Sequence, residues 1–182
     1  FDESFLAEVA QMKQKNLAVE LLRKLIDDQV KAYRKKSVVK AGKFSEMLQQ
    51  SVNAYLNGML TNAEVIQQLL DMAKEIMEAR QEGKALGLDD EELAFYDALT
   101  KPQAIKDFYA NDELVAITRE LTDTLRRNRT IDWQKKDDAR ARMRRSIKRL
   151  LKKHKYPPDE VPEAIETVMQ QCELWVDYGE GN

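Results

Sequence analysis

Apolar residues recur along this chain every three or four positions, which is the spacing of one face of an α-helix. Asn16 is a potential N-terminal cap for the clearest stripe. That stripe consists of Leu17, Leu21, Leu25, Ile26, Val30 and Tyr33. A second stripe lies between Phe44 and Leu56, and Gly58 follows it as a stop signal. Nowhere do apolar and polar residues alternate for long enough to predict a strand.

Capping signals divide the rest of the chain into further helices. Thr61 with Glu64, and Asp89 with Glu92, have the three-residue spacing of a capping box. The helices predicted after Gly58 occupy residues 61–83, 89–99, 111–125, 135–155 and 162–176. We therefore predict an all-α fold: a single helical domain over residues 1–182, with about seven helices in an irregular bundle. The first residues, FDESFLAEVAQMK, already have an amphipathic pattern without an initiator Met, so we expect a piece of a longer protein.

Composition agrees with a folded helical protein. Of 182 residues, 34% are charged and 43% are apolar, with only six Gly and four Pro. No apolar run approaches the roughly 18 residues of a membrane span, and the acidic N-terminus is unlike a signal peptide. The lone Cys172 excludes an intrachain disulfide and fits a reducing compartment, so we expect a cytoplasmic protein.

Charge changes this picture in residues 135–155. This segment has eleven Lys and Arg against two Asp, a charge of about +9 in a chain of net charge −2. Either the segment is a solvated helix face, or it binds an anionic partner or DNA. The residues predicted to bind are Arg142, Arg144, Arg145, Lys148, Arg149, Lys152 and Lys153. Seven acids follow Pro158 with no base, so we expect the last helix to fold back against the basic one.

Candidate catalytic chemistry is sparse. His154 lies on the apolar stripe of the basic helix, where packing is a better interpretation than ligation. The acids at 89–92 are better explained as a helix cap than as a cation site. Trp133 is better explained as a hydrophobic staple than as a stacking platform. One Cys and one His cannot form a usual zinc site, and no P-loop motif occurs. We therefore expect no catalytic, cofactor-binding or metal-binding residue.

Four segments taken together resemble a known family. KNLAVELLRKLI (15–26), KFSEMLQQSVNAYLNG (43–58), EELAFYDAL (91–99) and TIDW…RARMRRSIKRLLKKHKYPP (130–158) resemble, in order, the C-terminal region of the restriction (R) subunit of type I restriction-modification enzymes. The resemblance covers nearly the whole chain. One departure is Lys155, which stands where the resemblance leads us to expect a glycine.

The resemblance implies a much larger parent subunit. Such subunits have a nuclease domain, two ATP-driven translocase domains and a helical C-terminal domain, and they join methylation and specificity subunits. ATP and Mg²⁺ are thus implied for the full-length nuclease, with no cofactor in this region. The family's catalytic motifs lie outside the matching segments, so no catalytic residue is carried over.

The function expected from the resemblance is non-catalytic assembly. This region would dock the translocase and endonuclease onto the methyltransferase–specificity core. An alternative is a helical module whose basic helix, residues 135–155, contacts DNA during translocation. A self-contained enzyme is a third possibility, against which the sparse set of reactive residues argues.

Overall fold

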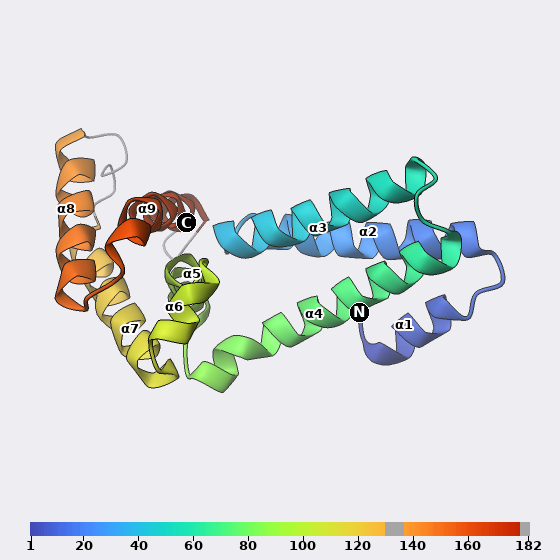
Figure 1. The fold of residues 1–182 in the computed structure, drawn as a ribbon, viewed down its shortest axis with the longest axis horizontal. Helices are drawn as coiled ribbons and strands as arrows, with labels where there is room; N and C mark the ends of the chain where they lie inside the picture. Colours follow the sequence, from blue (N-terminus) through green and yellow to red (C-terminus); the bar gives the residue numbers. More distant parts are fainter. Residues whose placement is uncertain (130–136, 179–182) are drawn as a thin grey trace. The chain divides into compact units, whose positions relative to one another are not determined.

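The computed structural model describes residues 1–129 and 137–178, and every regular element in them is a helix (Figure 1). The all-α prediction is confirmed, and the nine α-helices of this described part are close to the expected seven. None of these helices has the length and apolarity needed to cross a membrane. The elements are α1 (Glu3–Ala10), α2 (Lys15–Tyr33), α3 (Val38–Leu56), α4 (Asn62–Leu86), α5 (Asp90–Leu99), α6 (Gln103–Phe108), α7 (Asn111–Asn128), α8 (Asp137–Lys153), the 3₁₀ helix η2 (Pro158–Glu160) and α9 (Val161–Tyr178).

The chain forms two compact units, each with its own hydrophobic core. The first unit comprises Phe1–Arg34 and Lys40–Glu82, and the second comprises Lys35–Val39 and Gly83–Asn182. One boundary between the units follows the end of α2, and the other two fall inside α3 and α4. The expectation of one domain over residues 1–182 stays a prediction, since two compact units can still unfold as one cooperative domain.

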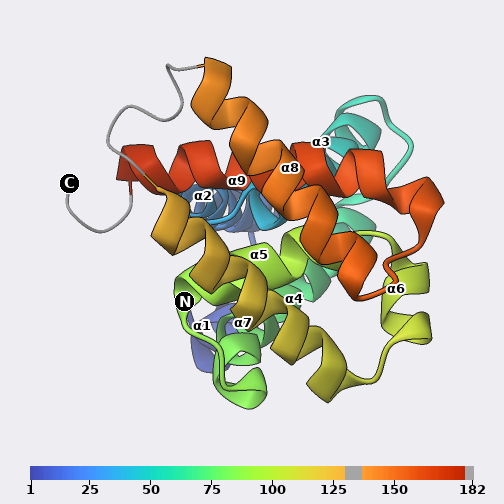
Figure 2. The same cartoon turned by 90° about the vertical axis from the view of Figure 1, so that its left-hand side faces the viewer.

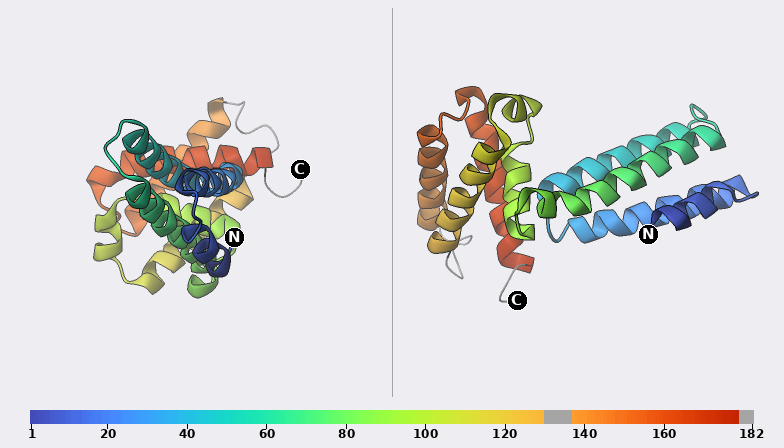
Figure 3. Two further views of the ribbon diagram at one scale, coloured as in Figure 1. Left: turned by 90° about the vertical axis from the view of Figure 1, so that its right-hand side faces the viewer. Right: turned by 90° about the horizontal axis from the view of Figure 1, so that it is seen from below.

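In the first unit, α1 contacts α2, and α3 is joined to α4 by the Lys43–Glu75 ion pair and by a hydrogen bond from the Ser51 hydroxyl to Gln68 Oε1 (Figures 1 and 3). The apolar stripes of α2, α3 and α4 face one another, as their 3.6-residue periodicity requires. Leu22, Ile26 and Leu69 are completely buried there, and Phe44 is 1% exposed. The Phe44 ring lies 5.7 Å from the ring of Tyr33, which closes one end of this core.

In the second unit, α5 packs against both α7 and α9, and α8 covers the other side of these two helices (Figure 2). Leu99, Leu121 and Val168 lie in its core with no exposed surface. The hydroxyl of the buried Tyr156 donates a 2.7 Å hydrogen bond to the main-chain oxygen of Leu99. The segment that follows α8 is thereby attached to the end of α5.

Both predicted capping boxes are confirmed. The Glu64 main-chain N–H donates to Thr61 Oγ1 at 3.2 Å, and Glu64 Oε1 accepts from the Thr61 N–H at 3.0 Å. Asp89 and Glu92 form the same reciprocal pair at 2.8 and 3.0 Å. Each box satisfies two backbone donors that the first helical turn leaves without partners.

Two predicted helix ends are wrong. Asn16 does not cap α2 but lies inside it, where its side-chain oxygen accepts from the Tyr55 hydroxyl at 3.2 Å. Gly83 does not end α4, which continues to Leu86 and ends at Gly87 with φ +72°. A left-handed residue is what allows the Leu88 N–H to reach back to the Gly83 oxygen, at 2.8 Å.

Gly83 has a packing role instead. A Cβ atom at this position would lie 3.0 Å from the main-chain oxygen of Leu88 and 3.3 Å from a methyl carbon of Leu93. The glycine therefore lets α4 approach the residues that lead into α5.

Residues 35–39 are held in the second unit by one buried amide. Gln171, on α9, is 4% exposed. Its Oε1 accepts from the Val38 N–H and its Nε2 donates to the Lys36 oxygen, both at 2.9 Å. Beside it, the Ser37 hydroxyl lies 3.4 Å from Asp97 Oδ2. The turn between α2 and α3 is thus anchored by side chains from α5 and α9.

Candidate functional site

The basic segment forms α8, and its apolar stripe anchors it to the core. Met143, Ile147, Leu150 and Leu151 are at most 6% exposed, in accord with the helical spacing in the sequence. The predicted helix began at Lys135, but that residue and Lys136 lie outside the described residues. The buried stripe fixes the rotation of α8, and so determines which basic side chains face other helices.

Acidic residues neutralise bases on both flanks of the buried stripe of α8, those of α9 on one flank and Glu120 of α7 on the other. Arg140 is paired with Glu173, and Arg144 with Glu166, both on α9. Near the end of α8, Lys153 Nζ lies 2.7 Å from Oε1 of Glu120 on α7. The predicted folding back of the acidic last helix onto the basic helix is confirmed by the two α9 pairs. Two of the seven predicted binding residues, Arg144 and Lys153, are therefore already engaged within the chain.

The side of α8 that faces away from the buried stripe carries cations without acidic partners among the described residues. Five side chains here are exposed, and none forms an ion pair or hydrogen bond with a described residue. We call them the free basic face: Arg142, Arg145, Lys148, Arg149 and Lys152. All five belong to the predicted binding set. Since exposed like charges repel one another at this density, such a face is suited to an anionic partner.

A hollow of about 520 Å³ lies between the end of α7 and this face. Four guanidinium groups line it, together with the side chains of Asn128 and Ser146, and no described carboxylate does. Three of the arginines are on the free basic face: Arg142, Arg145 and Arg149. The fourth, Arg127, belongs to the last turn of α7. The sequence prediction missed Arg127 because it precedes the basic segment in the chain.

His154 follows the last residue of α8 and is bound to α7. Its Nε2 lies 2.6 Å from Glu120 Oε2, and its main-chain oxygen accepts a 2.7 Å hydrogen bond from the Tyr109 hydroxyl. Hydrogen bonds from Lys153 and His154 hold the pKa of the Glu120 carboxyl below its usual range. These contacts agree with the packing interpretation of His154.

Lys155 ends α8 in an unusual backbone conformation. Its φ of +58° is in the left-handed region, and it is the one described non-glycine residue with positive φ. The Tyr156 N–H donates to the Leu151 oxygen at 2.9 Å, and the Lys155 N–H donates to the Lys152 oxygen at 3.1 Å. This pair of bonds is a Schellman motif, which normally places a glycine where Lys155 stands. The departure noted in the sequence thus falls on a position whose backbone favours glycine.

The acids before α5 act as helix caps and ion-pair partners. Arg126 donates to Asp89 Oδ2 at 3.3 Å and to Glu91 Oε2 at 3.0 Å. Burial raises the pKa of Asp89, but hydrogen bonds from the Glu92 backbone and from Arg126 outweigh it and lower that pKa. Among the described residues, no three His, Cys, Asp or Glu side chains converge as metal ligands do.

The second tryptophan is part of the core of the second unit. Trp175 is 6% exposed, and its ring meets the edge of Phe95 at 5.7 Å. The Arg129 guanidinium lies 4.4 Å from the same ring. Cys172 is buried, and burial raises the pKa of its thiol, which keeps the thiol protonated and unreactive. The staple predicted for Trp133 lies outside the described residues.

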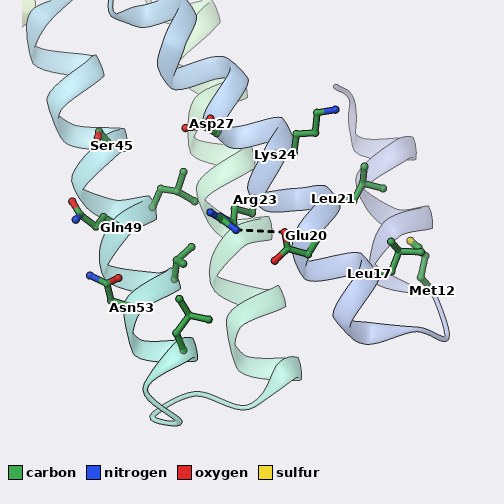
Figure 4. A pocket seen from close by; sticks show the side chains of 13 residues that line it. Met12, Leu17, Glu20, Leu21, Arg23, Lys24, Asp27, Ser45, Gln49 and Asn53 are labelled. Atoms are coloured by element: carbon green, nitrogen blue, oxygen red, sulfur yellow. Dashed lines mark hydrogen bonds and ion pairs between the residues drawn. The ribbon is translucent and has the colours of Figure 1, made fainter.

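The first unit has an apolar groove of about 870 Å³ between α2 and α3 (Figure 4). Leu17 is 52% exposed and Leu56 is 73% exposed along it. On the α2 side the rim carries Glu20 and Arg23, which pair with each other at 3.4 Å. Both leucines belong to the apolar stripes predicted from the sequence, but a hydrophobic stripe does not reveal which of its edges another helix covers.

With this geometry established, comparison with known proteins assigns the chain to a family. The family model described as "Type I restriction enzyme HindI endonuclease subunit-like, C-terminal" matches residues 1–177. The chain belongs to this family. The resemblance seen in the four sequence segments is therefore confirmed.

Two relatives of this HindI-like C-terminal region are curated restriction enzyme subunits. The chain is 38% identical over 171 residues to the type I restriction enzyme HindI endonuclease subunit of Haemophilus influenzae. It is 34% identical over 154 residues to the putative type I restriction enzyme MjaIXP endonuclease subunit of Methanocaldococcus jannaschii. These matches cover 94% and 83% of this chain.

The chain spans only a small part of each of these relatives, 16% of the HindI subunit and 14% of the MjaIXP subunit. No solved structure matches the chain. The HindI-like C-terminal family thus identifies the region, whereas its contacts have to be inferred from the free basic face and the other surfaces described above.

Proposed function

We propose that this chain is a non-catalytic assembly region of a type I restriction enzyme endonuclease subunit. It docks the ATP-dependent translocase and nuclease parts of that subunit onto the methyltransferase–specificity core. Membership of the HindI-like C-terminal family supports this proposal. The observation that carries it is the free basic face, whose five exposed cations have no acidic partner among the described residues.

The proposal of a non-catalytic role rests on the residues available. The sequence contains one His and one Cys, and it has no P-loop. His154 is bound to Glu120, and Cys172 is buried with a raised pKa. ATP and Mg²⁺ are therefore assigned to other parts of the full-length subunit. We expect the purified chain to have no ATPase or nuclease activity, with or without DNA.

A pull-down tests the docking role. The tagged chain is mixed with the methyltransferase–specificity core after nuclease treatment, so that DNA cannot bridge the two. The test variant replaces Arg142, Arg145, Arg149 and Lys152 with Gln. The matched control replaces four exposed lysines outside α8, namely Lys13, Lys24, Lys74 and Lys84, with the same loss of charge. We expect the test variant to lose most of its salt-sensitive core binding and the control to keep it. Equal binding by both variants would contradict a docking role for the free basic face.

The arginine-lined hollow favours a second candidate function, contact with DNA during translocation. Phosphate contacts come largely from Lys and Arg and need no base recognition. A gel-shift assay of the chain alone, without the methyltransferase–specificity core, separates this function from docking. Binding to duplex DNA that the fourfold Gln variant loses would support it.

A further inference from the structure

We propose that the hollow lined by Arg127, Arg142, Arg145 and Arg149 is a phosphate-binding site for the backbone of double-stranded DNA. This inference rests on the second candidate function and specifies where and how the backbone would be held. It adds Arg127, on α7, to a surface otherwise formed by α8.

The distribution of ion pairs supports a site rather than a uniformly charged surface. The arginines of α7 and α8 that do not line the hollow all have acidic partners; for example, Arg126 binds Asp89 and Arg144 binds Glu166. The four arginines of the hollow have none among the described residues. Arg127 donates instead to the Thr124 hydroxyl, at 3.3 Å. The arginines left for an external anion are thus the ones that surround the concave part of the surface, whereas Lys148 and Lys152, which also have no acidic partner among the described residues, lie outside it.

The side chains of the hollow match the chemistry of a phosphodiester. A guanidinium presents a planar fork of N–H donors that can bind two phosphate oxygens at once. Asn128 and Ser146 add neutral amide and hydroxyl groups of the type that also contact DNA phosphates. Asn128 Nδ2 already donates to the Thr124 oxygen at 2.8 Å, so its second N–H and the Ser146 hydroxyl are the neutral donors for the acceptor oxygens of a phosphate.

The length of the free basic face favours a polymer with closely spaced charges. Arg142 and Lys152 are ten positions apart on one helix, which corresponds to about 15 Å at roughly 1.5 Å per residue. One strand of duplex DNA carries a negative charge about every 3.4 Å along the helix axis. About four phosphates therefore lie along this distance. An acidic peptide would need an uninterrupted run of Asp or Glu to reach the same charge density.

The hollow is suited to the backbone rather than to the bases. No aromatic side chain of a described residue lines it, and base stacking on aromatic rings is what holds most unpaired strands. We therefore expect binding to duplex DNA without sequence preference. With about four phosphates neutralised, affinity should fall by about a hundredfold between roughly 50 and 200 mM salt.

Fluorescence anisotropy with a labelled 20-bp duplex tests the site. The hollow variant replaces Arg127, Arg142 and Arg145 with Gln. The matched variant replaces Lys148, Lys152 and Lys155 with Gln, which removes the same charge from the same region outside the hollow. We expect the hollow variant to bind at least thirtyfold more weakly than the wild type and the matched variant no more than tenfold more weakly, because its lysines meet the same strand outside the hollow and as single point charges. All six residues are exposed, so both variants should melt like the wild type.

The other outcomes separate this inference from the functions proposed above. Equal losses in the two variants would overturn the site while leaving DNA contact by the basic helix intact. No duplex binding by the wild type at low salt would overturn both, and would not affect docking in the nuclease-treated pull-down. Displacement of the duplex by polyglutamate as efficiently as by unlabelled duplex would overturn the preference for phosphate, in favour of an acidic protein partner.

Discussion

Lys155 ends α8 in a left-handed backbone conformation that glycine adopts more easily than a residue with a side chain. A left-handed residue with a Cβ costs roughly 1–2 kcal/mol relative to glycine, and Lys155 has φ +58°. We expect Lys155→Gly to raise the free energy of unfolding by about 1 kcal/mol and the melting temperature by about 2–4 °C. Circular dichroism melts measure both quantities.

Lys152→Gly provides the control for this prediction. Lys152 is also exposed but lies inside α8, where glycine should destabilise by about 1 kcal/mol relative to a good helix former. Opposite shifts in the two variants are the expected result. A melting temperature that falls in both would show that Lys155 makes a stabilising contact that offsets its backbone conformation.

Glu120 links stability to acid pH. The pKa of the Glu120 carboxyl is lower in the folded chain than its usual value of about 4.5. The ionised carboxylate therefore adds its full share to the free energy of unfolding above pH 4.5, and this share is lost as pH falls through the lower pKa of the folded state. Glu120→Gln should lower the melting temperature slightly at pH 7, because exposed pairs contribute only about 0–1 kcal/mol. The difference from the wild type should shrink as pH falls below 4.5, because Glu120 becomes protonated. Melting curves recorded between pH 3 and pH 7 test this, and a constant difference would contradict it.

Among the helices, apolar packing rather than ion pairing should hold α9 on α8. Met169 is 1% exposed in the core of the second unit, and Met→Ala changes at such sites typically cost about 2–5 kcal/mol. The pairs made by Arg140 and Arg144 are partly exposed, so each should contribute about 0–1 kcal/mol.

Chemical denaturation of two variants tests this comparison. We expect Met169→Ala to lower the free energy of unfolding by at least twice as much as Arg140→Gln combined with Arg144→Gln. If the double Gln variant is the less stable of the two, the two ion pairs contribute more to the free energy of unfolding than the packing of Met169 does, which would contradict the prediction.

Most of the helices could be predicted from the sequence, whereas α6, several helix limits and the packing partners of the helices could not. The capping boxes at Thr61 and Asp89 depend on residues three positions apart, so local sequence determines them. The end of α4 was predicted at Gly83, but the helix continues to Leu86 and Gly87 ends it. Gly83 instead makes room for Leu88 and Leu93. Those residues follow the helix, and their position cannot be inferred from periodicity.

The candidate site shows the same division. The charge of α8 and its buried stripe follow from helical spacing, so the free basic face could be predicted. The contribution of Arg127 could not, since it requires knowing that the end of α7 lies beside α8. The seven predicted residues were also treated as equivalent, although acids on α7 and α9 neutralise Arg144 and Lys153.

For the whole molecule, the two hydrophobic cores share no residue. A destabilising substitution in one core should therefore speed amide hydrogen exchange mainly in the unit that contains it. Ile26 is completely buried in the first unit, and Ile→Ala there should cost about 2–5 kcal/mol. Hydrogen exchange followed by mass spectrometry should show faster exchange in α2 and in the part of α4 before Gly83. The reduction in protection should be at least tenfold, since each 1.4 kcal/mol corresponds to about a factor of ten.

Leu121→Ala is the reciprocal variant, because Leu121 is completely buried in the second unit. It should accelerate exchange in α5, α7 and α9 and affect α2 much less. Equal loss of protection in both units for either variant would show that they open as one cooperative domain, as the sequence prediction of a single domain implies.

The anchoring of residues 35–39 by Gln171 also affects how the protein is made. The Gln171 side chain and its two main-chain partners are separated by 133 and 135 positions. At synthesis rates of about 5–20 residues per second, the turn waits roughly 7–27 s on the ribosome before its amide partner exists. During that interval the polar groups of Lys36 and Val38 must remain hydrated. The second unit therefore includes residues that are synthesised before α3 and α4 of the first unit, but it can be completed only after α9 has been synthesised.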